Sequence, residues 1–194
     1  MATKLNQLDL KKYNLDDYEF EELISEENIR KRVEEIGQEI SKDFANKIPV
    51  IIGVLNGSFL FMADLVRNIN IDYEVDFIKI SSYGNSTKSS GTVRLIKDIS
   101  ADINGRDLII VEDIVDTGLS VDFLNNRLQE AKPASISFVT CLKKPSKVNV
   151  DHLINYIGFN ISNSFVIGYG LDYAQKFRGL PSIYKLNPKK VSKW

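Results

Sequence analysis

Residues 108–120 read LIIVEDIVDTGLS, and they join the pattern of a buried strand to a polar turn and the start of a helix. Four apolar residues run directly into two carboxylates, Glu112 and Asp113, and a third carboxylate, Asp116, precedes a turn of small residues. Carboxylates at the end of a strand can hold sugar hydroxyls or Mg²⁺. Free N–H groups at a helix start, beside a glycine, bind phosphate. The stretch therefore predicts a strand-turn-helix unit that binds a phosphorylated sugar.

Apolar patterns on both sides of this stretch alternate between the strand and helix periods. Ser25 is placed to cap a helix whose apolar residues, from Ile29 to Phe44, recur every three or four positions. Strands are predicted near 50–55, 74–82, 93–99, 108–112, 136–142, 156–159, 165–169 and 183–186, and helices at 58–68 and from just after Ser120 to about 131. This alternation predicts an α/β fold with a parallel sheet and with ligands at the carboxyl ends of its strands.

Length and composition narrow the class of protein. The 194 residues suit one domain, and a formal net charge of −1 argues against a dedicated nucleic-acid binder. No apolar run approaches 18 residues, and the polar start of the chain does not suit a signal peptide. The single cysteine, Cys141, and the single histidine, His152, are interpreted as structural. We therefore expect a cytoplasmic protein with no nucleic-acid or membrane partner.

Other phosphate-binding motifs fit less well. The pattern G-x-x-x-x-G-K-[ST] does not occur, and Gly168-Tyr169-Gly170 is followed by Tyr173 where a dinucleotide fingerprint needs its third glycine. A plain strand-turn-helix with surface acids remains the alternative for residues 108–120.

The sequence VEDIVDTG of residues 111–118 resembles the motif with which type I phosphoribosyltransferases bind phosphoribosyl pyrophosphate (PRPP), in its hypoxanthine-guanine form. Three further segments follow the family's order, and the resemblance covers roughly residues 20–187. It implies the type I phosphoribosyltransferase fold, a central, mostly parallel sheet flanked by helices. It also implies a single domain over residues 1–194, with a small hood formed by the N-terminal segment and about residues 150–190.

The resemblance assigns PRPP to the motif itself. The residues it implies for PRPP and its 5′-phosphate are Glu112, Asp113, Asp116, Thr117, Gly118, Leu119 and Ser120. Glu112 and Asp113 match the pair that takes the ribose hydroxyls, directly or through Mg²⁺. Asp116 matches the residue beside the reacting purine nitrogen, either as general base or as a charge that stabilises a cationic ribosyl carbon.

Pyrophosphate is assigned to Leu55, Asn56, Gly57 and Arg178. The family has a Leu-Lys-Gly loop with a cis peptide at residues 55–57, so Asn56 keeps the backbone but removes a side-chain charge. An ordinary Asn-Gly turn remains the alternative. Ser82 and Tyr83 match the start of the family's flexible loop, which continues to Thr92 and closes over the reacting groups.

The purine is assigned to Lys143, Phe165, Val166 and Asp172. Lys143 matches the lysine that donates to the purine O6, and the adjacent Lys144 is interpreted as solvated. Phe165 matches the ring that stacks on the base, and Val166 the residue whose backbone reads the base edge. Glu112, Asp113 and Asp172 are the implied Mg²⁺ ligands.

The implied function is purine salvage, in which the 5-phosphoribosyl group of PRPP passes to hypoxanthine or guanine, giving IMP or GMP and pyrophosphate. The implied assembly is a homodimer or homotetramer. Two alternatives stay open: a xanthine- or adenine-selective phosphoribosyltransferase, and a PRPP-sensing regulator with the same fold.

Overall fold

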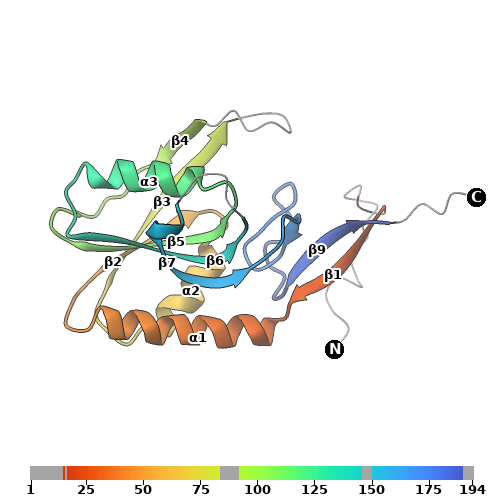
Figure 1. The fold of residues 1–194 in the computed structure, drawn as a ribbon, viewed down its shortest axis with the longest axis horizontal. Coiled ribbons are helices and arrows are strands. Elements are labelled where there is room, and N and C mark those ends of the chain that lie inside the picture. The colour runs from red at the N-terminus through yellow and green to blue at the C-terminus, as the bar shows by residue number, and fades with distance from the viewer. Residues whose placement is uncertain (1–14, 16, 84–91, 146–149, 190–194) are drawn as a thin grey trace, which may run out of the picture.

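The fold consists of two β-sheets with helices on both faces of the larger one (Figure 1). The computed structural model describes residues 15, 17–83, 92–145 and 150–189. None of the helices in these ranges is long and apolar enough to cross a membrane.

The larger sheet has six strands in the order β4-β3-β2-β5-β6-β7. Every neighbouring pair is parallel except β3 and β4, which are antiparallel. The strands are β2 (Val50–Leu55), β3 (Glu74–Tyr83), β4 (Thr92–Lys97), β5 (Asp107–Val115), β6 (Ser135–Lys143) and β7 (Ile154–Asn160). The prediction of a mostly parallel α/β sheet is confirmed.

Helices cover both faces of this sheet, with α1 (Glu26–Asp43) and α2 (Phe59–Arg67) on one face and α3 (Leu119–Gln129) on the other (Figure 1). Alternate residues of a strand point to opposite faces of the sheet, so β5 contributes to two hydrophobic clusters. Ile109 and Val111 of β5 pack in the cluster of α1 and α2, whereas Leu108 and Ile110 pack in the cluster of α3. Because both faces of β5 are covered, its apolar run is continuous.

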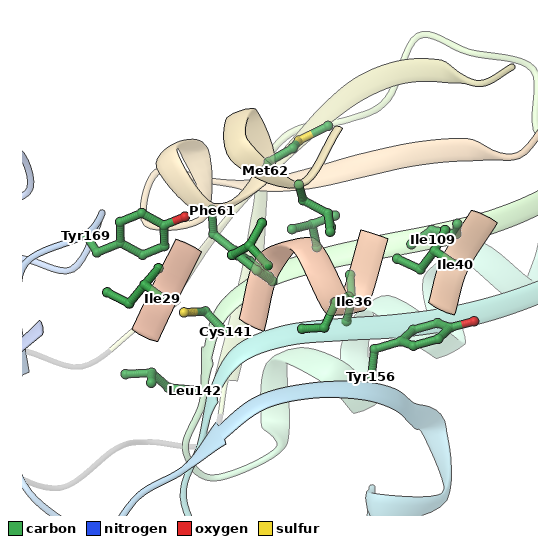
Figure 2. Close-up of a cluster of buried hydrophobic side chains, with 14 of the residues drawn as sticks. Ile29, Ile36, Ile40, Phe61, Met62, Ile109, Cys141, Leu142, Tyr156 and Tyr169 are labelled. Carbon is green, nitrogen blue, oxygen red and sulfur yellow. The ribbon is translucent and has the colours of Figure 1, made fainter. Parts of the chain in front are cut away.

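Helix α1 forms as its sequence pattern predicts. The Ser25 hydroxyl accepts a hydrogen bond from the Asn28 amide at 3.3 Å and caps the helix. Ile29, Ile36 and Ile40 then face the sheet and contribute to the core in Figure 2. These side chains are at most 2% exposed, so their burial anchors the helix.

The smaller sheet has the order β1-β9-β8, and we call it the hood sheet. It is antiparallel and is formed by β1 (Tyr18–Ile24), β8 (Val166–Ile167) and β9 (Ile183–Pro188). Strand β7 lies in the segment predicted for the hood, about residues 150–190, but it pairs with β6 and so extends the larger sheet. Strand β1 was not predicted, since its partner β9 lies about 160 residues further along the chain.

Strand β5 continues three residues beyond its predicted end at Glu112, because Ile114 and Val115 pair with Leu142 and Lys143 of β6. The two acids of the motif therefore lie within a strand. Successive strand residues point to opposite faces, so Glu112 faces α3 and Asp113 faces α2.

Candidate functional site

A cavity of about 560 Å³ opens at the carboxyl ends of β2, β3 and β5. Its lining is mainly polar and is contributed by these strand ends, the turn after β2, the start of α3 and the segment between β8 and β9. The lining residues are Val54, Leu55, Asn56, Gly57, Lys79, Ile80, Ser81, Glu112, Asp113, Ile114, Ser120, Asp172, Gln175 and Arg178. This is the edge at which an open α/β sheet binds ligands.

Glu112 is only 4% exposed, and its Oε1 has no hydrogen-bond partner among the described residues. Burial, and then the charge of Asp113, raise its pKa well above the ordinary value, while the Ser120 hydroxyl opposes the shift. A buried carboxylate oxygen without a partner is costly. Glu112 is therefore poised to receive a donor or a cation from a ligand.

Asp113 lies against the turn that follows β2. Burial raises the pKa of its carboxyl to about 6, although the Ile114 amide donates to it at 2.9 Å and the Arg178 charge favours ionisation. A Cβ atom at Gly57 would collide with the Asp113 carboxylate, so a larger residue there would require that carboxylate to move. The peptide bond between Leu55 and Asn56 is cis.

Asp113 should reduce stability at neutral pH. A carboxyl whose pKa is about 6 when folded and about 3.8 when unfolded binds its proton more strongly in the native state. The native state therefore loses stability as pH rises from about 4 to 6. Asp113→Asn should raise the unfolding free energy by about 1–3 kcal/mol at pH 7.5 and by much less at pH 4.5, as measured by urea denaturation.

The exposed Asp122 of α3 provides the control, because Asp122→Asn removes a carboxylate that is not buried. An equal rise in the unfolding free energy of Asp113→Asn at both pH values, or no rise at pH 7.5, would contradict the raised pKa of this carboxyl.

Arg178 is held by groups from its own segment. Its Nη2 lies 2.7 Å from Asp172 Oδ1 and donates to Gln175 Oε1 at 3.0 Å, while its Nη1 donates to the Gly170 carbonyl at 2.7 Å. The second oxygen of Asp172 accepts from the Gln175 amide at 2.7 Å. The guanidinium therefore reaches the cavity in a fixed orientation.

The turn after β5 presents backbone donors. Gly118 adopts φ +85°, in the left-handed region that favours glycine, and it is the N-cap of α3. The Leu119 amide lies 3.5 Å from Thr117 Oγ1, a long contact that leaves the amide available. A helix start with free amides favours an anion, as the sequence predicts for this turn.

The two adjacent lysines at the end of β6 point to different partners. Lys143 Nζ lies 2.9 Å from Asp151 Oδ2, whereas Lys144 Nζ lies 3.4 Å from Asp116 Oδ2. Lys144 is only 9% exposed, so its interpretation as a solvated residue is wrong. The Lys144 amide also donates to the Val115 carbonyl at 2.9 Å, which holds the lysine beside the end of β5. Lys144 is therefore the lysine next to Asp116.

The proposed base-stacking segment lies at the start of β8. Phe165 is 52% exposed, and its ring meets that of Tyr173 edge to face at 5.9 Å between centroids. Val166 is buried and pairs with Lys185 of β9. An exposed aromatic ring beside a fixed strand is suited to stacking on a planar ligand.

The cavity brings together eight of the residues that the sequence analysis selected and leaves the others outside its lining. Those that line it are Leu55, Asn56, Gly57, Glu112, Asp113, Ser120, Asp172 and Arg178. Those that do not are Asp116, Thr117, Gly118, Leu119, Lys143, Phe165 and Val166. Ser82 and Tyr83 are the last residues of β3, and the expected loop beyond them falls on residues 84–91, outside the described residues.

The residues that the sequence analysis did not select include Lys144, Lys79 and Gln175. Lys144 could not be separated from Lys143, because the strand register was unknown. Lys79 carried a usable signal, a charge within the predicted strand 74–82, where it pairs with the last residue of β2. No sequence signal identified Gln175, because it lies in an irregular segment, where its φ is +65°.

The donor set fits a metal ion only in part. Among the described residues, no group of three or more acidic, histidine or cysteine side chains is placed to hold a metal. The buried, unpartnered Glu112 Oε1 nevertheless suits a hard cation. Mg²⁺ usually binds one or two carboxylates and completes its shell with substrate phosphates and water. The site therefore fits a metal that arrives with a phosphorylated substrate.

Comparison with known proteins agrees with this site. The model of the phosphoribosyl transferase domain matches residues 20–174. The chain therefore belongs to the phosphoribosyltransferase family.

Within that family the similarity is to hypoxanthine-guanine phosphoribosyltransferases. That of Bacillus subtilis (strain 168) is 47% identical over 166 residues, which cover 86% of this chain and 92% of the relative. The crystal structure of a Bacillus anthracis hypoxanthine-guanine phosphoribosyltransferase superposes with a TM-score of 0.80 at 45% identity, over 85% of this chain and 97% of the other. The crystal structure of a Staphylococcus aureus hypoxanthine phosphoribosyltransferase superposes with a TM-score of 0.83 at 37% identity, over 96% of this chain and 100% of the other. Enzymes of this family use a metal ion in catalysis.

Proposed function

We propose that this chain transfers the 5-phosphoribosyl group of PRPP to hypoxanthine or guanine, giving IMP or GMP and pyrophosphate. One observation carries the proposal. A single strand-turn-helix unit, β5 to α3, carries the acidic pair Glu112 and Asp113, then Asp116, and then the glycine turn that starts α3, and Lys144 from the end of β6 pairs with Asp116. Sugar, phosphate and base can then be bound side by side.

In this scheme the turn at the start of α3 binds the 5′-phosphate, and the Leu119 amide and the Ser120 hydroxyl donate to it. Glu112 Oε1, which is unpartnered among the described residues, accepts from a ribose hydroxyl. Because Glu112 and Asp113 lie on opposite faces of β5, they hold the sugar ring across the end of the strand. Binding thus removes the cost of the buried, unpaired oxygen.

The pyrophosphate group lies over the turn at Asn56 and Gly57, with Arg178 as a donor whose planar fork suits paired phosphate oxygens. Mg²⁺, bound with PRPP, would supply positive charge to the leaving pyrophosphate. Glu112, Asp113 and Asp172 are the residues that would hold it. Asp172 also pairs with Arg178, so its carboxylate orients a side chain that binds the pyrophosphate.

Asp116 lies beyond the strand end, with a side chain that is 55% exposed. In the proposed reaction its carboxylate takes the proton from the attacking purine nitrogen, and its charge stabilises the ribosyl carbon as that carbon becomes cationic. The ammonium of Lys144 keeps the carboxylate near the base.

Lys144 is the residue that we propose selects 6-oxopurines. An ammonium donates hydrogen bonds but cannot accept them, so it binds O6 of hypoxanthine or guanine and not the 6-amino group of adenine. Lys144→Ala should lower kcat/KM for hypoxanthine by about ten- to a hundredfold and lower that for adenine much less. Initial rates with each base, at saturating PRPP, measure both values.

Lys143→Ala is the matched control, because it removes a neighbouring lysine whose ammonium pairs with Asp151. It should leave the ratio of hypoxanthine to adenine close to that of the unmutated protein. If Lys143→Ala narrows that ratio and Lys144→Ala does not, the original assignment of O6 to Lys143 is restored.

The same proposal includes a cytoplasmic location, a homodimer or homotetramer, and one domain with a hood. The family resemblance supports the assembly, and the hood sheet of β1, β9 and β8 supports the division into core and hood.

A further inference from the structure

Acidic side chains outnumber basic ones in the lining of the cavity, and only one of the two basic side chains has partners among the described residues. Three carboxylates, Glu112, Asp113 and Asp172, face two cations, Lys79 and Arg178. Arg178 is already engaged, since its guanidinium contacts Asp172 and two oxygens of its own segment. A pyrophosphate group entering this cavity brings several negative charges into a lining that is already acidic. Beside a metal ion that arrives with PRPP, a side-chain cation that is still available would favour its binding.

Lys79 is that cation. Its side chain is partly exposed, and within residues 17–83, 92–145 and 150–189 its ammonium makes no hydrogen bond or ion pair. The neighbouring lysine across the strand pair, Lys97, differs on each point. The Lys97 ammonium donates to the Phe77 carbonyl at 2.7 Å and lies 3.7 Å from Asp76, and the residue does not line the cavity.

The strand register places Lys79 beside the pyrophosphate turn. Lys79 is the partner of Leu55 in the parallel pairing of β2 with β3, and Asn56 follows Leu55 directly. Asn56 lines the same cavity but contributes a neutral amide. Residues 56 and 79 are thus two neighbouring positions from which one positive charge can reach the same part of the cavity.

We propose that Lys79 supplies the side-chain charge that binds the pyrophosphate of PRPP, in the role that Asn56 cannot fill. The proposal rests on the proposed function, because it takes pyrophosphate as the group bound at this end of the cavity. It assigns Lys79 to ligand binding and leaves proton transfer to Asp116. Lys79 therefore acts on PRPP and on pyrophosphate but not on the nucleotide product, which has no pyrophosphate.

Relocating the charge tests this directly. The probes are magnesium pyrophosphate and IMP, each titrated calorimetrically into the full-length protein. Lys79→Met should weaken pyrophosphate binding by about ten- to a hundredfold and raise the KM for PRPP in the same direction. IMP binding should stay within about twofold. Lys79→Arg should keep most of the affinity, and Asn56→Lys combined with Lys79→Met should recover most of what Lys79→Met loses.

Lys31→Met is the control, because Lys31 is an exposed lysine of α1 that does not line the cavity. Unchanged pyrophosphate binding in Lys79→Met would overturn the assignment, as would an equal loss of IMP and pyrophosphate binding, which would indicate a general disturbance of the site. The proposed function fails separately, if the unmutated protein transfers no phosphoribosyl group to any purine.

Discussion

Asp116→Asn should lower kcat by about 10²–10⁴-fold, the range expected when general-base assistance is lost. The Asp116 side chain is 55% exposed and its contact is with Lys144 at 3.4 Å, so the substitution should not disturb the fold. Asparagine keeps the shape of the side chain but removes both the proton acceptor and the negative charge. The KM for PRPP should change by less than about threefold, because Asp116 does not line the cavity assigned to pyrophosphate and its carboxylate cannot donate to the 5′-phosphate.

Steady-state kinetics with hypoxanthine measure both constants, and Asp122→Asn is the matched control because it neutralises an exposed carboxylate in the first turn of α3. An Asp116→Asn enzyme with an unchanged kcat would remove Asp116 from catalysis. A large rise in KM with an unchanged kcat would make it a binding residue.

Removal of divalent metal should abolish turnover. The unpartnered Glu112 Oε1 and the carboxylates of Asp113 and Asp172 are hard oxygen donors, but the described residues form no complete metal site of their own. We therefore expect the metal to come with the substrate and to be lost to a chelator. In excess EDTA the initial rate should fall to background, and an excess of Mg²⁺ or Mn²⁺ should restore it.

Asp172→Asn refines this test, since it should raise the Mg²⁺ concentration required for half-maximal rate. Substitution of Asp122, which lies outside the cavity, should leave that concentration unchanged. Full turnover in excess EDTA would show that the reaction needs no divalent metal.

Local patterns were sufficient to predict much of the fold. The apolar period from Ile29 to Ile40 and the cap at Ser25 predict α1, and the α/β alternation predicts the parallel sheet. Both depend on neighbouring residues. The hood sheet depends instead on the pairing of β1 with β9, which are far apart in sequence, and no local pattern identifies such partners.

In the site, too, the features that depend on neighbouring residues could be predicted and those that depend on long-range contacts could not. The acids and the glycine turn of residues 112–118 could be recognised because their spacing is local. The sequence analysis chose Lys143 over Lys144, but adjacent residues at the end of a strand can face opposite sides, and only the structure shows that Lys144 meets Asp116. The fixing of Arg178 by Asp172 and Gln175 depends on an irregular segment between β8 and β9.

The identity of the products formed from PRPP tests the central claim most directly. The protein is incubated with PRPP, Mg²⁺ and one of hypoxanthine, guanine, xanthine or adenine, and nucleotide and pyrophosphate are quantified by mass spectrometry and a coupled assay. We expect IMP from hypoxanthine and GMP from guanine, each in a one-to-one ratio with pyrophosphate, and much less product from adenine. PRPP binding without nucleotide formation from any base would contradict the account and favour a PRPP-sensing regulator, and efficient conversion of adenine would contradict the 6-oxopurine assignment.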